Sequence, residues 1–192
     1  MHMKTEIDKT VFGKYPEFES KRLLFRKPSL YDAKDILFIR TDNDVMRFMD
    51  VTRFESVQDG EKWIMTIWES FEKQEGITWI IEDKSTNAFA GYFGFWRMIP
   101  EHCRAEIGYA LNPQFWGKGF MTETLKTMME YGFRTLNLHS VEANVNPENE
   151  NSIKVLEKIG FQKEAHFKEN YLFNGKFLDS IIYSLLEKNF KK

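Results

Sequence analysis

The segment from residue 114 to residue 119 has the composition of an anion-binding loop. It lies between a predicted strand and a predicted amphipathic helix and reads Gln114-Phe115-Trp116-Gly117-Lys118-Gly119. Its two glycines leave the backbone N–H groups accessible, and the N-terminus of a helix attracts negative charge. A P-loop would need Ser or Thr where Gly119 stands, and a dinucleotide fingerprint would need Gly or Ala in place of Thr122. The loop therefore predicts a phosphate site of another type, although an ordinary flexible turn fits these six residues equally well.

Short motifs stand on both sides of this loop. In chain order they are Glu106-Ile107-Gly108-Tyr109 before it, and Asn146-Pro147, Asn149-Glu150-Asn151-Ser152 and Lys158-Ile159-Gly160-Phe161 after it. Together with the loop, these motifs resemble the GNAT superfamily of acetyl-CoA-dependent N-acetyltransferases. Within it, the chain resembles the branch that acetylates the N-termini of ribosomal proteins. The similarity extends from Arg22 to about Leu186.

The resemblance implies a mixed α/β (α+β) fold, with a central, mostly antiparallel sheet that is splayed in the middle and flanked by about four helices. Acetyl-CoA is the implied cosubstrate, and no metal is implied. It would lie in a wedge where two neighbouring central strands part, with its pantetheine arm along residues 109–111 and its pyrophosphate on residues 114–119. The resemblance also implies a homodimer as one oligomeric state.

Individual residues receive roles from the same resemblance. Asn149 would hydrogen-bond to the pantetheine arm, and Ser152 would lie close to the thioester sulfur. The residues expected at acetyl-CoA are Tyr109, Ala110, Leu111, Gln114, Phe115, Trp116, Gly117, Lys118, Gly119, Phe120, Met121, Asn149 and Ser152.

Acetyl transfer to an amine needs a proton source for the leaving thiolate. Many relatives place a tyrosine four residues before the Gly-Phe pair, but this chain has Leu156 there. Ser152 is the expected substitute, either donating a proton directly or relaying one from water. A serine at a helix start is also a plain N-cap, and both roles can hold at once.

The reaction also needs a base for the attacking amine. Glu142 and Asn144 alternate onto one face of a strand that should flank the cleft, and Glu106 lies on the strand that should hold the cosubstrate. Asn144 stands where many relatives carry a glutamate. Either Glu142 or Glu106, acting through a water, is the candidate base, while a solvated or ion-paired structural role fits both side chains as well.

Three hypotheses about the acceptor remain open. An α-amine has a pKa near 7.7–8.0, so on the order of 10% is neutral at pH 7, whereas a lysine amine offers under about 0.1%. This favours the N-terminal α-amine of a protein, such as a ribosomal protein. The second hypothesis is a small amine, such as a polyamine, an aminoglycoside or an amino-acid-like metabolite. The third is a non-catalytic acyl-CoA-binding module, suggested by Leu156 and Asn144.

The elements that must position these residues follow from periodicity and turn residues. Apolar residues recur with helical spacing from Met121 to Phe133, and alternating or apolar runs separated by polar turns indicate strands. We expect strands at 22–26, 79–81, 89–95, 105–111, 140–145, 165–173 and 177–186, and helices at 30–41, 59–74, 121–133 and 152–159. The first dozen residues are polar and aperiodic and predict a loose lead-in, and residues 45–54 are the expected lid on the acceptor side.

Composition and charge exclude several classes of protein. The 192 residues predict one domain over 1–192, with a core of about 21–187. A formal net charge of −2 argues against nucleic-acid binding, and no apolar run approaches the roughly 20 residues of a membrane span. The single Cys103 and the lack of a leader segment favour the cytoplasm, with Cys103 as a small packed residue. His102 and His139 have no partner at metal-ligand spacing and predict surface or turn positions.

Overall fold

The strands form a single mixed sheet in a computed structural model that describes residues 6–191. They are β1 (Phe18–Glu19), β2 (Leu23–Arg26), β3 (Ile77–Asp83), β4 (Ala88–Ile99), β5 (Arg104–Leu111), β6 (Ser140–Val145), β7 (Gln162–Phe173) and β8 (Lys176–Leu186). Their order in the sheet is β1-β2-β3-β4-β5-β6-β8-β7. Every neighbouring pair is antiparallel except β5 and β6. The expected mixed α/β, mostly antiparallel sheet is therefore confirmed.

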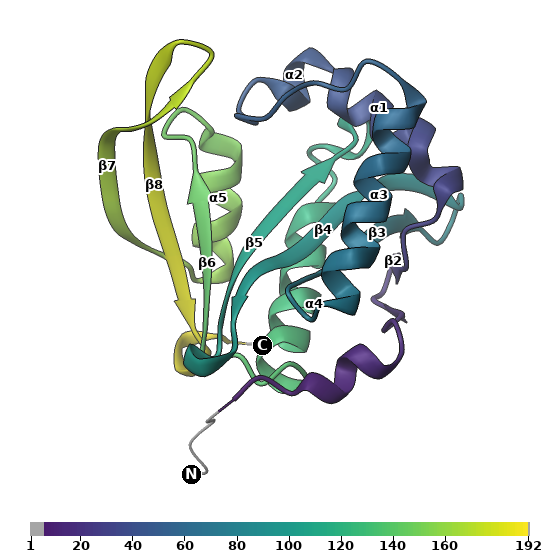
Figure 1. Cartoon of the computed structure of the whole chain (residues 1–192). Coiled ribbons are helices and arrows are strands. Elements are labelled where there is room, and N and C mark those ends of the chain that lie inside the picture. The colour runs from purple at the N-terminus through teal and green to yellow at the C-terminus, as the bar shows by residue number, and fades with distance from the viewer. Residues whose placement is uncertain (1–5, 192) are drawn as a thin grey trace.

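Helices cover both faces of this sheet. The α-helices are α1 (Ala33–Thr41), α2 (Asn43–Met46), α3 (Val57–Glu72), α4 (Phe120–Arg134) and α5 (Glu150–Ile159). Short 3-10 turns are η1 (Lys9–Gly13), η2 (Leu30–Asp32), η3 (Pro100–His102), η4 (Pro113–Phe115) and η5 (Glu187–Asn189). Apolar residues of α1 and α3 pack on one face, and those of α4 and α5 pack on the other (Figure 1). None of the described helices is long and apolar enough to cross a membrane.

The sheet splits between β5 and β6. These parallel strands pair only from Arg104 with Ser140 to Glu106 with Glu142, after which they diverge (Figure 1). The edge of β5 that faces β6 therefore has no strand partner from Ile107 to Leu111 within the described chain. The two carboxylates Glu106 and Glu142 stand side by side where the wedge begins.

Most of the predicted elements are present, with ends displaced by a few residues. The predicted helix at 30–41 starts as the 3-10 turn η2 before α1, and the helix predicted at 59–74 is α3, which begins two residues earlier. The Asn174-Gly175 turn joins β7 and β8 as expected, with φ of 47° and 76°. Cys103 is buried, as predicted for a small packed residue.

The prediction of a loose lead-in is wrong for the described part of the N-terminus. Residues 9–13 form η1, and Ile7 is only 3% exposed in the main core. Val11 and Phe12 pack against the same core, and the Asp8 N–H donates to the carbonyl of Leu136. Three apolar residues in a short polar segment are too few to give a clear periodic signal, yet their burial fixes the segment. The remainder of the predicted lead-in, residues 1–5, lies outside the described residues.

Candidate active site

The end of the loop between β5 and α4, together with the first turn of α4, contains several backbone N–H groups without a hydrogen-bond acceptor. The N–H groups of Gln114, Phe115 and Trp116 are used within the η4 turn, where they donate to Asn112 and Pro113. The first bond of α4 runs from the Glu123 N–H to the Gly119 carbonyl. Within residues 6–191, the N–H groups from 117 to 122 therefore have no acceptor. An anion at this helix start would satisfy them.

Two glycines shape this N–H row. Gly117 and Gly119 have φ values of 71° and 76°, a left-handed conformation that side-chain-bearing residues rarely adopt. A Cβ at Gly117 would meet no atom within 4 Å, so the space above the loop is open. Gln114, Trp116 and Lys118 are exposed around it. The residues present therefore fit a bound pyrophosphate.

Buried and ion-paired side chains anchor the loop to the rest of the protein. Phe115 and Phe120 are 8% and 6% exposed, with ring centroids 5.0 Å apart, and Met121 packs against the core beside them. Only the backbone of the two phenylalanines can therefore face a ligand. Arg22 donates from Nη1 to the Lys118 carbonyl at 2.9 Å and pairs through Nε with Glu123 at 2.6 Å.

The outer side of this loop is basic. A hollow of about 530 Å³ lies there, and its charged lining consists of Lys21, Arg22, Lys84, Lys118 and the carboxylate Asp83. An excess of positive charge attracts the phosphates of an anionic ligand. The positive charge around the loop and the N–H groups without acceptors therefore both favour a bound anion.

The free edge of β5 runs from this loop toward the apex of the wedge. Tyr109, Ala110 and Leu111 pair with Phe93, Tyr92 and Gly91 of β4 on one side only. Backbone groups at such an edge can pair with the amides of an extended ligand. This arrangement fits the expected position of a pantetheine arm.

Of the two alternatives for Ser152, the N-cap role is wrong. Helix α5 begins at Glu150, and Asn149 is its N-cap, because the Asn149 side chain accepts a hydrogen bond from the Ser152 N–H at 3.1 Å. The Ser152 hydroxyl instead shares a 2.7 Å hydrogen bond with the phenol of Tyr109 on β5. The Ser152 side chain is thus directed from α5 across the wedge.

Burial keeps the Tyr109 phenol protonated. It raises the pKa of Tyr109 to about 12, although the hydrogen bond with Ser152 acts in the opposite direction. Leu156 stands where many relatives carry a tyrosine proton donor, and its side chain is buried in the core. Tyr109 was expected at the cosubstrate only through its backbone. Its side-chain role has no signal in the sequence, because 43 residues separate it from Ser152.

The two candidate bases, Glu106 and Glu142, meet at the apex of the wedge, each with an arginine. Arg97 Nη1 lies 3.2 Å from a Glu106 carboxylate oxygen, and Arg104 Nη1 lies 3.0 Å from one of Glu142. The Glu106 side chain is 14% exposed and that of Glu142 is 28% exposed. Burial raises the pKa of Glu106 above its ordinary value, and the Arg97 charge opposes this shift. Glu106 is therefore the carboxylate better suited to accept a proton.

A pocket of about 320 Å³ opens at Gly108, two residues along β5 from Glu106, on the face covered by α3. Its floor includes Gly94 of β4 and Gly108 of β5, which pair in the sheet. Trp63, Tyr92 and Trp96 are among the side chains that line it.

The expected lid segment, residues 45–54, reaches this pocket through Met49. The next residue, Asp50, accepts a hydrogen bond from Tyr171 of β7. This contact links the two halves of the splayed sheet and has no counterpart in the sequence pattern.

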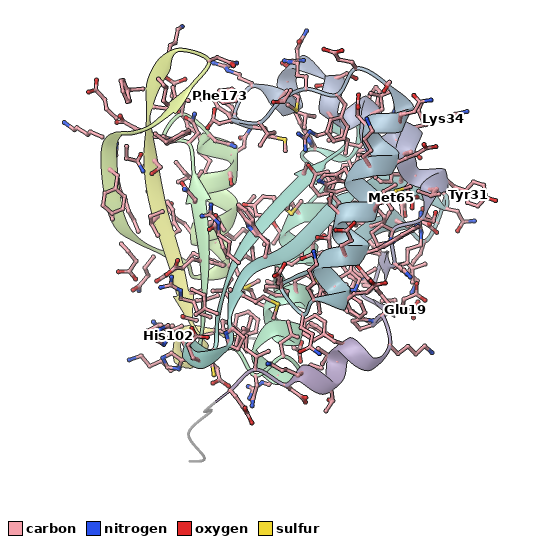
Figure 2. All side chains as sticks on the ribbon, viewed as in Figure 1. Glu19, Tyr31, Lys34, Met65, His102 and Phe173 are labelled. Atoms are coloured by element: carbon pink, nitrogen blue, oxygen red, sulfur yellow. The ribbon has the colours of Figure 1, made fainter. Side chains whose placement is uncertain are left out.

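The two histidines considered in the sequence, His102 and His139, both lie on the surface. His102 is exposed at the turn before β5 (Figure 2), and His139 is exposed before β6, as the sequence predicted. Among residues 6–191, no group of three or more His, Cys, Asp or Glu side chains could hold a metal ion.

Comparison with known proteins agrees with this geometry. Residues 22–162 match the model of the family described as "Acetyltransferase (GNAT) domain". The chain is 33% identical over 173 residues to the uncharacterized N-acetyltransferase YoaA of Bacillus subtilis, covering 90% of this chain and 98% of the relative. It superimposes on a GNAT-family acetyltransferase from Bacillus anthracis with a TM-score of 0.80 and 27% identity, covering 90% of this chain and 99% of that one.

Two relatives of named activity match a shorter part of the chain. Spermidine N(1)-acetyltransferase of Escherichia coli is 36% identical over 80 residues, covering 42% of this chain and 43% of the relative. The Escherichia coli acetyltransferase of the alanine of ribosomal protein uS5 is 34% identical over 79 residues, covering 41% of each chain. The chain belongs to the GNAT acetyltransferase family and is an N-acetyltransferase that uses acetyl-CoA.

Proposed function

We propose that this N-acetyltransferase acts on the N-terminal α-amine of a protein. The observation that carries the proposal is the apolar pocket at Gly108, two residues along β5 from Glu106, which has none of the unpaired carboxylates that a polyamine needs. Among the described residues, those lining the pocket include no Asp or Glu. The two carboxylates at the apex, Glu106 and Glu142, are each paired with an arginine. A single amine is therefore a better match than a polycation.

The residues around the wedge divide the reaction between them. When bound, acetyl-CoA supplies an activated acetyl thioester and a thiolate leaving group. The N–H groups of residues 117–122 would hold its phosphates, and the free edge of β5 would hold its arm. Asn149 caps α5 with its side-chain oxygen, which leaves its amide NH₂ to donate to the arm. Ser152, supported by Tyr109, donates a hydrogen bond where negative charge develops on sulfur.

Glu106 accepts the amine proton, directly or through one water. Burial raises its pKa, which makes it a stronger base than a solvent-exposed carboxylate. The α-amine lessens the demand on this base, because on the order of 10% is already neutral at pH 7. This modest requirement supports a protein N-terminus as acceptor.

Replacing Glu106 by glutamine should lower kcat/KM about tenfold at pH 7 and progressively less above pH 8, where most of an α-amine is already neutral. A pH profile of kcat/KM, with Glu142→Gln in parallel, measures this. If Glu106→Gln retains the wild-type profile while Glu142→Gln loses the activity at neutral pH, Glu142 is the base.

A small amine is the second candidate acceptor. The hydrogen bond between Tyr171 and Asp50 joins the expected lid segment to β7, next to Met49 of the pocket lining, and an acceptor without a polypeptide chain attached would fit beside this link. The partial relatives include both a spermidine enzyme and a ribosomal-protein enzyme, so they support both candidates.

Release of CoA thiol from acetyl-CoA distinguishes the two candidates. We expect release with peptides that have a free N-terminus and none with the same peptides after N-terminal blocking. Spermidine, an aminoglycoside and ethanolamine should react with a kcat/KM at least about tenfold lower, as expected when the pocket contacts are missing. Release from the small amines alone would contradict the proposal and favour the second candidate.

A further inference from the structure

We infer that the pocket beside Gly108 binds a large, uncharged apolar or aromatic group attached next to the acceptor amine. For a protein acceptor, that group is the side chain of the first residue. The inference rests on the proposed function for the position of the amine, and it extends that function by naming the acceptor class.

Gly108 is a glycine that the fold itself does not require. Its φ lies outside the left-handed region, and a Cβ there would meet only Trp96 Nε1, at an ordinary distance of 3.6 Å. By contrast, a Cβ on Gly91 would lie 2.2 Å from the Ala110 carbonyl oxygen, so close packing of β4 and β5 explains that glycine. A glycine inside a strand weakens the strand and commonly marks the close approach of a ligand. The absence of a side chain at Gly108 keeps the pocket open.

The lining selects an uncharged group. Aromatic rings and aliphatic side chains surround the space, and no Asp, Glu, Lys, Arg or His is among the described lining residues. The polar side chains that line it are those of Thr66, Ser70, Thr78 and Tyr92, whereas the Tyr109 side chain points to the other face of β5 and bonds to Ser152. A charged group would lose its hydration there without gaining a partner of opposite charge.

The rim of the pocket also disfavours a cation. The Arg97 guanidinium lies 4.6 Å from the centroid of the Trp96 ring, and it pairs with Glu106. Its positive charge would oppose a second cationic group on the acceptor, while the amine itself can be neutral when it reacts. A lysine side chain or a polyamine chain is therefore a poor occupant.

Size and position fit one substituent beside the amine. A volume of about 320 Å³ is at the small end of the range for ligand pockets and suits a single large side chain. Gly108 and Glu106 are two residues apart on the same face of β5, which corresponds to about 6.6 Å along the strand. The α-amine of a first residue can therefore reach Glu106 while the side chain on the same carbon enters the pocket at Gly108.

Gly108→Val tests this assignment, because it fills the pocket with a residue that favours a strand. The substrates are two peptides that differ only in the first residue, Phe or Gly. For the wild type we expect kcat/KM to be at least about tenfold higher for the Phe peptide. Gly108→Val should remove this ratio by lowering kcat/KM at least about tenfold more for the Phe peptide than for the Gly peptide, since only the Phe side chain occupies the pocket. Gly108→Ala should give an intermediate ratio.

Gly13→Val is the matched control, because a Cβ at Gly13 meets no neighbour within 4 Å, one at Gly108 makes only an ordinary contact, and Gly13 lies on η1, outside the lining of the pocket. It should leave the ratio unchanged. CoA binding and thermal unfolding verify that each variant is folded. If Gly108→Val does not fold, the ratio measured for Gly108→Ala tests the inference.

The outcomes separate this inference from the proposed function. Equal rates on both peptides, a preference for a Lys peptide, or an unchanged ratio in a folded Gly108 variant would overturn the inference and leave the protein acceptor intact. Activity on 2-phenylethylamine well above ethanolamine, lost in Gly108→Val and without activity on any peptide, would overturn the protein acceptor and support the pocket assignment.

Discussion

Replacing Gly119 by glutamate should abolish CoA binding at concentrations that saturate the wild type. The new carboxylate would stand among the N–H groups that are expected to hold the pyrophosphate. At about 4 Å, two like charges repel by about 4 kcal/mol at an effective dielectric constant of 20. That energy corresponds to a loss of affinity of about 100-fold or more. Isothermal titration with CoA measures the change directly.

The hairpin glycine supplies a control with the same backbone conformation. Gly175 has the same φ of 76° as Gly119, and a Cβ there meets no atom within 4 Å. Gly175→Glu therefore introduces the same strain and the same charge at a distant turn, and CoA affinity should not change. Gly119→Gln separates the effect of charge from that of bulk. Wild-type affinity in Gly119→Glu would mean that the phosphates bind elsewhere.

Local signals predicted most of the fold. The stripe from Met121 to Phe133 became α4, and Gly160 ends α5 with a φ of 108°. The Asn174-Gly175 pair predicted the β7–β8 hairpin. Each of these signals acts within a few residues, where backbone preference and amphipathic spacing decide the structure.

The site depended on contacts that such signals do not contain. The motifs placed Ser152 at the start of a helix, but only the structure shows that Asn149 is the N-cap and that the serine hydroxyl contacts Tyr109. The open space at Gly108 likewise depends on strands and helices from distant parts of the chain. Tertiary packing, which single-sequence periodicity does not record, determines both features.

Ser152→Ala should lower kcat about 100-fold, the effect typical of losing one donor to a developing negative charge. The affinity for CoA should change little, because the hydroxyl is needed only as charge develops on sulfur. Tyr109→Phe should lower kcat by a similar factor. With a pKa of about 12, the Tyr109 phenol stays protonated at ordinary assay pH, and it orients the Ser152 hydroxyl. Single-turnover rates with saturating acetyl-CoA isolate this step from product release.

A double-mutant cycle distinguishes a joint role from two separate ones. If the phenol acts only through the serine, the double variant should be no slower than Ser152→Ala alone, since groups that act as one unit are not additive. Tyr183→Phe is the matched control, because it removes a buried phenol that bonds to Glu157 of the same helix, and kcat should be unchanged. Additive losses would assign Tyr109 a role of its own, and an unchanged kcat in Ser152→Ala would leave the Tyr109–Ser152 contact as a structural link between β5 and α5.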